Sequence, residues 1–286
     1  MSIIDKMRYQ IKQPDNIAVV DKFKKERGLE YLFYSDVRNR ILRPESIIKM
    51  LENFTEQEDV IENNSRNILK GFSGIHEQNR NIVIKKFGQH GLYDNIRFRL
   101  ISSRAIRALS IALKLQGLGI NIPTPLFAVE KRGRMNKLIN SFYVCRRKDF
   151  SFKLWDVYEE DFPEELRRKL LIELANSIKK IHDSNIFYGD LHPNNVHFLA
   201  NTDQDSGYDI YFLDFNRAYQ CDKMNIKMRA RDLYRLRMSP EIRDIFLKNY
   251  DLSSRKELER LIKKYLGRHR GRKSIREKLK GLLSRV

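Results

Sequence analysis

An aspartate and an asparagine in one short stretch have the types and spacing of a phosphotransferase catalytic loop. Asp190 and Asn195 occur in Tyr188-Gly189-Asp190-Leu191-His192-Pro193-Asn194-Asn195, which has the D-x-x-x-x-N spacing. A carboxylate at the first position can orient an acceptor hydroxyl and receive its proton, and an amide oxygen at the second can hold a metal ion beside phosphates. The pattern therefore predicts Asp190 as the catalytic base and Asn195 as a metal ligand.

A second candidate metal ligand follows a short apolar run later in the chain. Phe212-Leu213-Asp214-Phe215-Asn216 ends an apolar stretch in an aspartate followed by phenylalanine, as in the D-F-G metal site of kinases. Its carboxylate would ligate Mg²⁺, a hard ion that prefers oxygen ligands. A single aspartate of this kind is more often a turn residue, but two motifs in the right order favour phosphoryl transfer.

A third motif precedes both. Ile82-Val83-Ile84-Lys85-Lys86 resembles V-A-I-K, the strand that presents a lysine to the nucleotide phosphates. That register points Lys85 into the cleft and Lys86 outward, because strand side chains alternate. The alternative interpretation is a pair of solvent-facing lysines. The glycines expected before this strand, Gly71 and Gly74, do not form G-x-G-x-x-G, so a phosphate-binding loop and an incidental hairpin remain equally open.

The elements that would position these residues differ between the two halves of the chain. Residues 1 to about 60 are polar with helical patches, such as Ser46 to Phe54. The following region reads as strand, strand, a long helix from Asn95 to Leu118, strand and strand. The second half is mostly helical, with an amphipathic helix over residues 162–185 just before the Asp190 loop.

Composition limits the class of protein. The chain has 286 residues, 41% of them hydrophobic, which is enough for a sizeable core in one or two domains. Its two cysteines are far apart, which excludes a disulfide framework or zinc cluster and favours a reducing, cytoplasmic compartment. We find no signal peptide and no run long enough to span a membrane.

Positive charge is concentrated in two blocks. The net charge is +19, with a balance of +11 over Asn95 to Lys148 and +9 over Asp251 to Val286. Such blocks suggest a polyanionic partner, namely nucleic acid, anionic lipid or a phosphorylated saccharide. Solvated helix faces are the plainer interpretation. The apolar positions Ile275, Leu279, Leu282 and Leu283 suit a C-terminal helix that lies on an anionic surface. The competing interpretation is that they pack on the C-lobe while the charges face water.

These motifs resemble those of the lipopolysaccharide kinase family, which phosphorylates Kdo or heptose in the inner core of bacterial lipopolysaccharide. The resemblance covers roughly residues 65 to 250. The matching residues are Ser103-Arg104-Ala105, Gly119-Ile120 with Pro123 and Pro125, Gly189 to Asn195, Leu213 to Arg217, and Arg231-Asp232-Leu233 with Arg235-Leu236.

The resemblance implies an α+β, two-lobed protein-kinase-like fold with a small β-rich N-lobe and a larger helical C-lobe. The expected domains are an N-terminal extension packing on the core (1–64), the N-lobe (65–147) and the C-lobe with its basic C-terminal segment (148–286). The implied cofactors are ATP and Mg²⁺, with Lys85 on the ATP phosphates. The implied partners are a glycolipid or saccharide acceptor and an anionic membrane surface, which would place the protein peripherally on the cytoplasmic face of the inner membrane. Asp232 would hold the catalytic loop by backbone hydrogen bonds.

The sequence departs from the kinase pattern at the partner of the strand lysine. Kinases pair this lysine with a glutamate on the next helix, but residues 95–129 contain no acid and the equivalent position falls near Ala108. Lys85 would then pair with Asp214 or with a carboxylate of the N-terminal extension.

Two alternative functions stay open at this point. One is an atypical protein kinase like the small RIO or Bud32 types, although His192-Pro193 and the lack of an A-P-E segment favour a sugar or other small acceptor. The other is an inactive kinase scaffold that binds polyanions such as RNA, which would leave the complete set of Asp190, Asn195 and Asp214 as a coincidence. Nucleic acid is thus a possible partner but not the favoured one.

Overall fold

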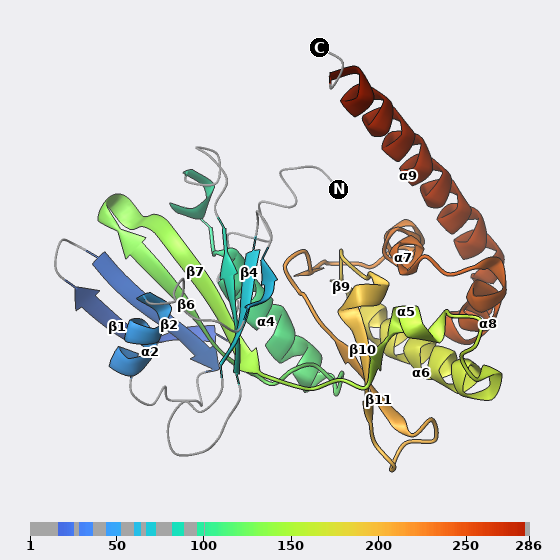
Figure 1. The fold of residues 1–286 in the computed structure, drawn as a ribbon, viewed down its shortest axis with the longest axis horizontal. Coiled ribbons are helices and arrows are strands. Elements are labelled where there is room, and N and C mark those ends of the chain that lie inside the picture. Colours follow the sequence, from blue (N-terminus) through green and yellow to red (C-terminus); the bar gives the residue numbers. More distant parts are fainter. Residues whose placement is uncertain are drawn as a thin grey trace. The chain divides into compact units, whose positions relative to one another are not determined.

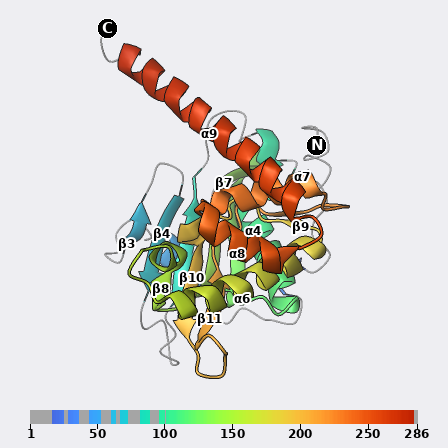
Figure 2. The same ribbon diagram turned by 90° about the vertical axis from the view of Figure 1, so that its right-hand side faces the viewer.

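The chain forms two compact units in a computed structural model (Figures 1 and 2). The structure describes residues 17–25, 29–36, 44–52, 60–63, 67–72, 82–88, 96–99 and 101–283. The first unit comprises Met1–Asp149 and Phe212–Tyr219, and the second comprises Phe150–Tyr211 and Gln220–Val286. The segment that contains the predicted metal-site motif thus belongs to the first unit, although its residues lie late in the sequence.

Within the described residues, seven antiparallel strands form the sheet of the first unit. Their order is β1-β2-β6-β7-β5-β4-β3. The bounds are β1 (Ile17–Lys25), β2 (Leu29–Asp36), β3 (Val60–Asn63), β4 (Asn67–Phe72), β5 (Ile82–Phe87), β6 (Pro125–Gly133) and β7 (Lys137–Arg146). The predicted strands β4, β5, β6 and β7 are confirmed. The polar N-terminal pattern does not predict β1 and β2, because β2 pairs with β6, about a hundred residues away in sequence.

The described residues of the first unit include the helices α2 (Pro44–Glu52) and α4 (Arg104–Gly117). α2 confirms the predicted helical patch. The single helix predicted from Asn95 to Leu118 is wrong in its first part. Residues 96–99 form one helical turn, residues 101–103 are not helical, and α4 (Arg104–Gly117) begins only after Ser103, whose side chain accepts a hydrogen bond from the Ile106 N–H. An N-cap serine satisfies a donor that the helix itself leaves free, so it fixes the helix start.

The second unit is mainly helical. Its helices are α5 (Leu154–Val157), α6 (Glu164–Asp183), α7 (Ile226–Leu233), α8 (Pro240–Tyr250) and α9 (Arg255–Leu283). β8 (Phe152–Lys153), β10 (Val196–Ala200) and β11 (Tyr208–Phe212) form a small sheet, and β9 (Ile186–Phe187) and β12 (Tyr219–Gln220) are short. As its periodicity predicts, α6 buries Leu170, Leu174, Ile178 and Ile181. None of the described helices has both the length and the apolar character needed to cross a bilayer.

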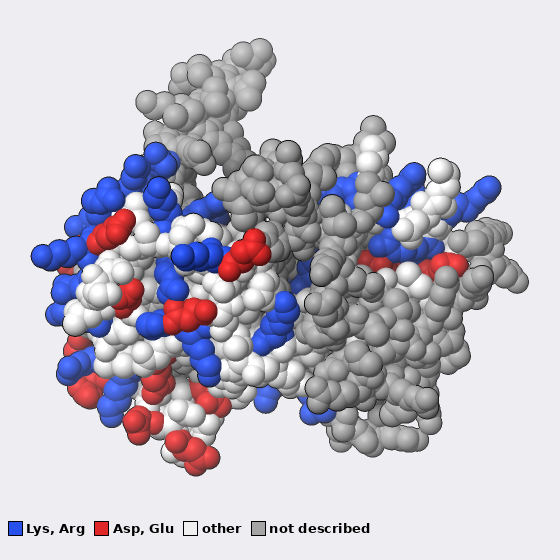
Figure 3. Space-filling view, turned by 180° about the vertical axis from the view of Figure 1, so that it is seen from behind, with Lys and Arg blue, Asp and Glu red and all other residues white. Residues whose placement is uncertain are grey.

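Positive side chains are exposed along the described part of α9. Lys256, Arg260, Lys263, Lys264 and Arg268 are all exposed. Figure 3 shows Lys and Arg gathered at the upper left of the described surface, with Asp and Glu scattered below them and toward the lower edge. The predicted apolar positions Ile275, Leu279, Leu282 and Leu283 have side chains outside the described part of the structure.

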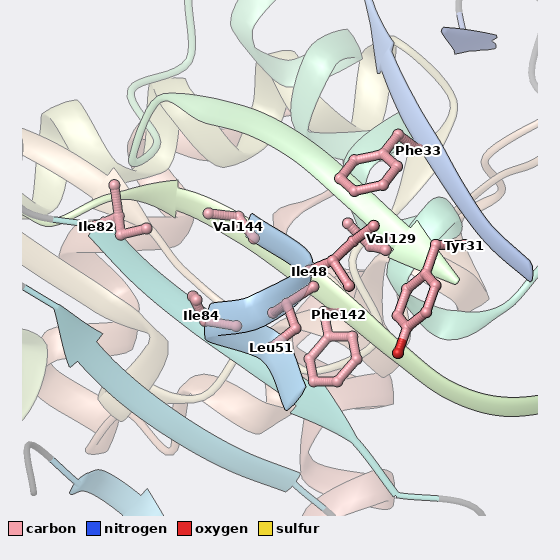
Figure 4. Packing of buried hydrophobic residues seen from close by; sticks show 9 residues of the cluster. All are labelled: Tyr31, Phe33, Ile48, Leu51, Ile82, Ile84, Val129, Phe142 and Val144. Carbon is pink, nitrogen blue, oxygen red and sulfur yellow. The ribbon is translucent and has the colours of Figure 1, made fainter. Parts of the chain in front are cut away.

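The two faces of the first unit's sheet have different environments. On one face, apolar side chains from β2, β5, β6 and β7 pack against Ile48 and Leu51 of α2 (Figure 4). Ile82 and Ile84 lie on this face, so Val83 and Lys85 lie on the other. Helix α4 packs on β6 and β7. Lys86 lies on the α2 face, where it lines a cavity with Leu51 and Phe142, which confirms the predicted alternation along β5.

Candidate functional site

The stretch with Asp190 and Asn195 folds into a tight loop closed by its own hydrogen bonds. The side-chain amide nitrogen of Asn195, Nδ2, donates to the backbone carbonyl oxygen of Asp190 at 2.8 Å. The His192 N–H donates to the same carbonyl at 2.7 Å, and the Asn195 N–H donates to the His192 carbonyl at 2.7 Å. Gly189 has φ 78°, a conformation open to glycine at little cost. The structure thus brings the predicted base and the predicted metal ligand together in one rigid turn.

Asp232, at the end of α7, holds this loop from beneath. Its carboxylate is fully buried and accepts hydrogen bonds from the Tyr188 N–H at 2.7 Å and the Gly189 N–H at 2.9 Å. The predicted structural role of Asp232 is confirmed. Its Oδ2 also lies 3.2 Å from Nε2 of His182, a fully buried histidine whose Nδ1 contacts the Tyr250 hydroxyl at 2.7 Å.

The Asp190 side chain itself faces a cation. Nη1 of Arg235 lies 3.3 Å from Asp190 Oδ1, and both side chains are about one quarter exposed. His192 is half-buried, and its ring packs edge-on against Trp155 with ring centres 5.9 Å apart. Burial lowers the pKa of His192, the positive charges of Arg237 and Arg235 lower it further, and Asp190 opposes them.

Lys85 and Asp214 form an ion pair in the first unit. Lys85 Nζ lies 2.8 Å from Asp214 Oδ2, with side chains 13% and 25% exposed. Of the two partners that the sequence left open for Lys85, the structure therefore shows Asp214. Asp214 has φ 63°, a left-handed conformation that is uncommon outside glycine and concentrates at functional sites. Its Oδ1 accepts a hydrogen bond from the Asn216 N–H at 3.3 Å.

Helix α4 offers no carboxylate to Lys85, and Ala108 on it is buried. Glu130 on β6 is the single acid in residues 95–148, and its hydrogen bonds join it to other residues. It is fully buried and accepts hydrogen bonds from Arg132 Nε at 2.7 Å, the Tyr34 hydroxyl at 3.0 Å and the Ser103 N–H at 3.2 Å. Sequence reasoning missed this role, although a lone acid within a strongly basic block was a visible signal.

The glycine prediction is only partly covered by the structure. Gly71 lies within β4, opposite Val83 of β5. Gly74 lies outside the described residues, so the choice between a phosphate-binding loop and an incidental hairpin stays open.

Comparison with known protein families identifies the family of this chain. The model of the lipopolysaccharide kinase (Kdo/WaaP) family matches residues 52–265. This chain belongs to that family. Its members are kinases, so the protein is a phosphotransferase that uses ATP. All the predicted site residues fall inside the matched range.

A solved structure supports the fold assignment. The structure described as WaaP in complex with acyl carrier protein is similar with a TM-score of 0.53 and 16% identity, over 79% of this chain and 98% of that one. At this identity the likeness concerns the fold, and it confirms the predicted kinase-like class with a β-rich and a helical part. No curated protein matches the chain.

Proposed function

We propose that this family member transfers the γ-phosphoryl group of ATP to a sugar hydroxyl, on Kdo or heptose, in the inner core of lipopolysaccharide. The observation that carries the proposal is the closed loop around Asp190 and Asn195, fixed from beneath by Asp232. Phosphoryl transfer depends on positioning more than on covalent chemistry by the protein, so a fixed loop is what the reaction needs.

In this proposal Asp190 is the catalytic base. Its carboxylate is partly exposed and so can meet an acceptor hydroxyl, while its backbone carbonyl is held by two hydrogen bonds from the same loop. A base must lie within hydrogen-bond reach of the proton that it takes, and a fixed backbone keeps the carboxylate in place for that step.

Lys85, Asp214 and Asn195 would bind the nucleotide and its metal ion. Lys85 is an ammonium that can turn from Asp214 to the phosphates. The donor set suits Mg²⁺: Asp214 offers carboxylate oxygens, and the amide nitrogen of Asn195 is used by the loop, which directs its amide oxygen to act as acceptor. When bound, the ion would neutralise charge that develops on the phosphates.

The test is transfer of phosphate to a defined acceptor. The full chain would be incubated with ATP, Mg²⁺ and lipid A whose core ends either in Kdo or in heptose, each with and without its acyl chains, and the product weighed by mass spectrometry. We expect a gain of one phosphate. Asp190→Asn should lower turnover by about 10²–10⁴-fold and leave ATP binding nearly intact, because the base acts on the acceptor.

A matched control uses Arg168→Gln, an exposed residue on α6. Its turnover should equal that of the wild type. Near-normal transfer by Asp190→Asn would contradict the assignment of the base, and no phosphate gain on either acceptor would contradict the proposed reaction.

We further propose that the basic face of α9 holds the protein peripherally on the anionic cytoplasmic surface of the inner membrane. Exposed Lys and Arg near such a surface contribute about 1 kcal/mol each. The exposed positive residues of α9 and the +9 balance of residues 251–286 support this.

Vesicle binding tests the docking proposal. Neutralising Arg268, Arg270, Arg272 and Lys273 should strongly reduce affinity for vesicles with anionic lipid, reduce its salt dependence and leave ATP hydrolysis in solution unchanged. The matched control neutralises exposed residues elsewhere in the second unit, namely Arg168, Lys169, Lys180 and Lys227. Equal vesicle binding by both variants would reject docking through α9.

A further inference from the structure

We propose that Trp155, His192, Arg235 and Arg237 form an acceptor subsite beside Asp190 that binds a sugar ring carrying an anionic group. This inference rests on the proposed function and specifies how the acceptor is recognised. The anionic group is a carboxylate or a phosphate on the same sugar that presents the hydroxyl. All the residues involved belong to the second unit.

An aromatic side chain stands beside the catalytic loop. Trp155 is the only tryptophan of the chain and lies on the short helix α5, whose neighbours Leu154 and Val157 are fully buried. Trp155 remains partly exposed and packs against the His192 ring. The His192 N–H donates to the Asp190 carbonyl, so this aromatic pair is fixed relative to the base. An aromatic face that is partly open to solvent suits the C–H groups of a sugar ring.

Two arginines, Arg235 and Arg237, come directly after α7 in the sequence. Arg235 lies in the 3-10 turn Tyr234–Leu236, directly after the helix that ends near Asp232. Arg237 follows with φ 56° and is exposed. The charges of both arginines act on the His192 ring. The catalytic loop from Asp190 to Asn195 has no Lys or Arg of its own, so its positive charge is supplied by this segment.

The contacts of Arg235 leave it able to bind more than Asp190. A guanidinium has five N–H donors in a planar fork that matches carboxylate and phosphate oxygens. Arg235 uses Nη1 for Asp190, at the long distance of 3.3 Å. Its Nε is buried without a hydrogen-bond partner within the described part of the chain. A donor group of this kind, beside a partly exposed base, points to an anionic ligand.

The ion pair also gives a reason why the acceptor should carry charge. Asp190 must receive a proton from the acceptor hydroxyl, while Arg235 occupies one of its carboxylate oxygens. An anionic group on the acceptor competes for the guanidinium of Arg235 and gives Arg237 a partner as well. The same sugar thereby frees the Asp190 oxygen that its hydroxyl needs. A neutral sugar offers Arg235 no such partner, so the guanidinium stays on Asp190 Oδ1.

Equilibrium binding without nucleotide tests this subsite. The full chain would be titrated with the methyl glycoside of Kdo, its carboxyl-reduced neutral form, heptose 4-phosphate and heptose. Calorimetry gives the affinity, and the fluorescence of Trp155 reports a ligand at the aromatic pair. We expect at least one anionic sugar to bind about tenfold or more tightly than its neutral counterpart.

The variants separate recognition from folding. Arg235→Gln and Arg237→Gln should each reduce the preference for the anionic sugar, whereas Arg168→Gln should keep it. Arg237 is exposed, so its variant should fold normally and keeps the test valid if Arg235→Gln is unstable. The Kdo pair and the heptose pair show whether the recognised anion is a carboxylate or a phosphate. Trp155→Ala should weaken binding of charged and neutral sugars alike.

The inference and the proposed function fail in different ways. The subsite would be overturned if Arg235→Gln and Arg237→Gln both kept the preference for the charged sugar. It would also be overturned if the wild-type protein bound charged and neutral sugars with equal affinity. Either result would count against the subsite even if phosphate transfer succeeds. Absence of transfer with an arginine-dependent preference intact would overturn the kinase reaction on these acceptors and leave the subsite standing.

Discussion

Within the part of the chain that the structure describes, each unit contains one fully buried carboxylate, and the two carboxylates have different hydrogen-bond partners. Among the described residues, Glu130 in the first unit and Asp232 in the second are the fully buried acids. Asp232 accepts hydrogen bonds directly from the backbone of the catalytic loop. Glu130 accepts hydrogen bonds from the side chains of Arg132 and Tyr34, and from the N–H of Ser103, the N-cap of α4.

The difference explains how each half of the candidate site is organised. The second unit fixes its loop before any ligand binds, because the buried acid and the loop backbone are bonded to each other. In the first unit the buried Glu130 fixes the start of α4 through the Ser103 N–H. Lys85 pairs instead with Asp214, which is itself a proposed ligand of Mg²⁺. Arg132 extends the Glu130 network to the Phe98 carbonyl and to Asn136, which ties the turn before α4 to the β6–β7 hairpin.

The largest effect should come from Asp232→Ala. It leaves the buried N–H groups of Tyr188 and Gly189 without acceptors, at about 1–3 kcal/mol for each. We expect a loss of about 2–6 kcal/mol of unfolding free energy, measured by urea unfolding with the fluorescence of Trp155, which lies in the same unit. Turnover should fall with it.

Asp190→Ala, in the loop that Asp232 holds, is the matched control. Its carboxylate is partly exposed and its ion pair with Arg235 is long, so stability should change by less than about 1 kcal/mol while turnover is lost. Equal unfolding midpoints for the two variants would show that Asp232 is no more structural than Asp190.

Glu130→Gln should have the next largest effect. The buried Arg132, 7% exposed, then loses its counter-charge, and breaking a buried pair in this way costs about 3–5 kcal/mol. Circular dichroism reports both units and Trp155 only the second. The unfolding transition of the first unit should therefore appear in circular dichroism at a lower urea concentration than the transition seen by Trp155 fluorescence. Adding Arg132→Met should recover part of the loss, and failure of the double variant to exceed the single one would contradict a charge-pair origin.

The Lys85–Asp214 pair should contribute little to stability and much to nucleotide binding. Lys85→Met should cost less than about 1 kcal/mol of unfolding free energy, because such a partly exposed pair is weak. By calorimetry, Mg·ATP should bind about tenfold or more weakly, since a charge-assisted contact to phosphate is lost. Asp214→Ala should also weaken it. Lys86→Met, on the opposite face of β5, is the control, and an equal loss of affinity there would remove the case for Lys85.

The sequence predicts those parts of the site that are local in the chain. The Asp190–Asn195 spacing, the strand with Lys85 and the acid Asp214 are each readable within a few residues. Asp232 is readable only through the family resemblance, because its partners Tyr188 and Gly189 lie more than forty residues earlier. The hydrogen bonds in the structure then show the physical basis of that role.

The features that the sequence does not predict depend on contacts between residues that are far apart in the chain. Neither β1 and β2 nor the Glu130 network can be derived from local patterns, since β2 meets β6 and Glu130 meets Tyr34 at separations near a hundred residues. The break before α4 carried a local signal in Ser103, a good N-cap residue. The continuous apolar spacing obscured this signal, because the periodicity of buried side chains does not indicate where a helix begins.

The smallest predicted effect concerns the charges around the loop of the second unit. Burial is the main cause that lowers the pKa of His192, and the charge of Arg237 is the next. Arg237→Gln should therefore raise the pKa of His192 toward its ordinary value of about 6.5 without reaching it, because burial persists. The ring proton shifts in an NMR titration measure this directly.

The sign of the accompanying stability change follows from proton binding. With a lowered pKa in the folded state, the unfolded chain binds more protons at mildly acidic pH, so His192 makes stability fall as the pH drops through about 6.5. Arg237→Gln should lessen that fall, whereas Arg168→Gln should leave both the titration and the pH dependence unchanged. An unaltered His192 titration in Arg237→Gln would mean that Arg237 does not act on the loop. The contrast between the units would then rest on Asp232 alone, with no contribution from the cations that follow it.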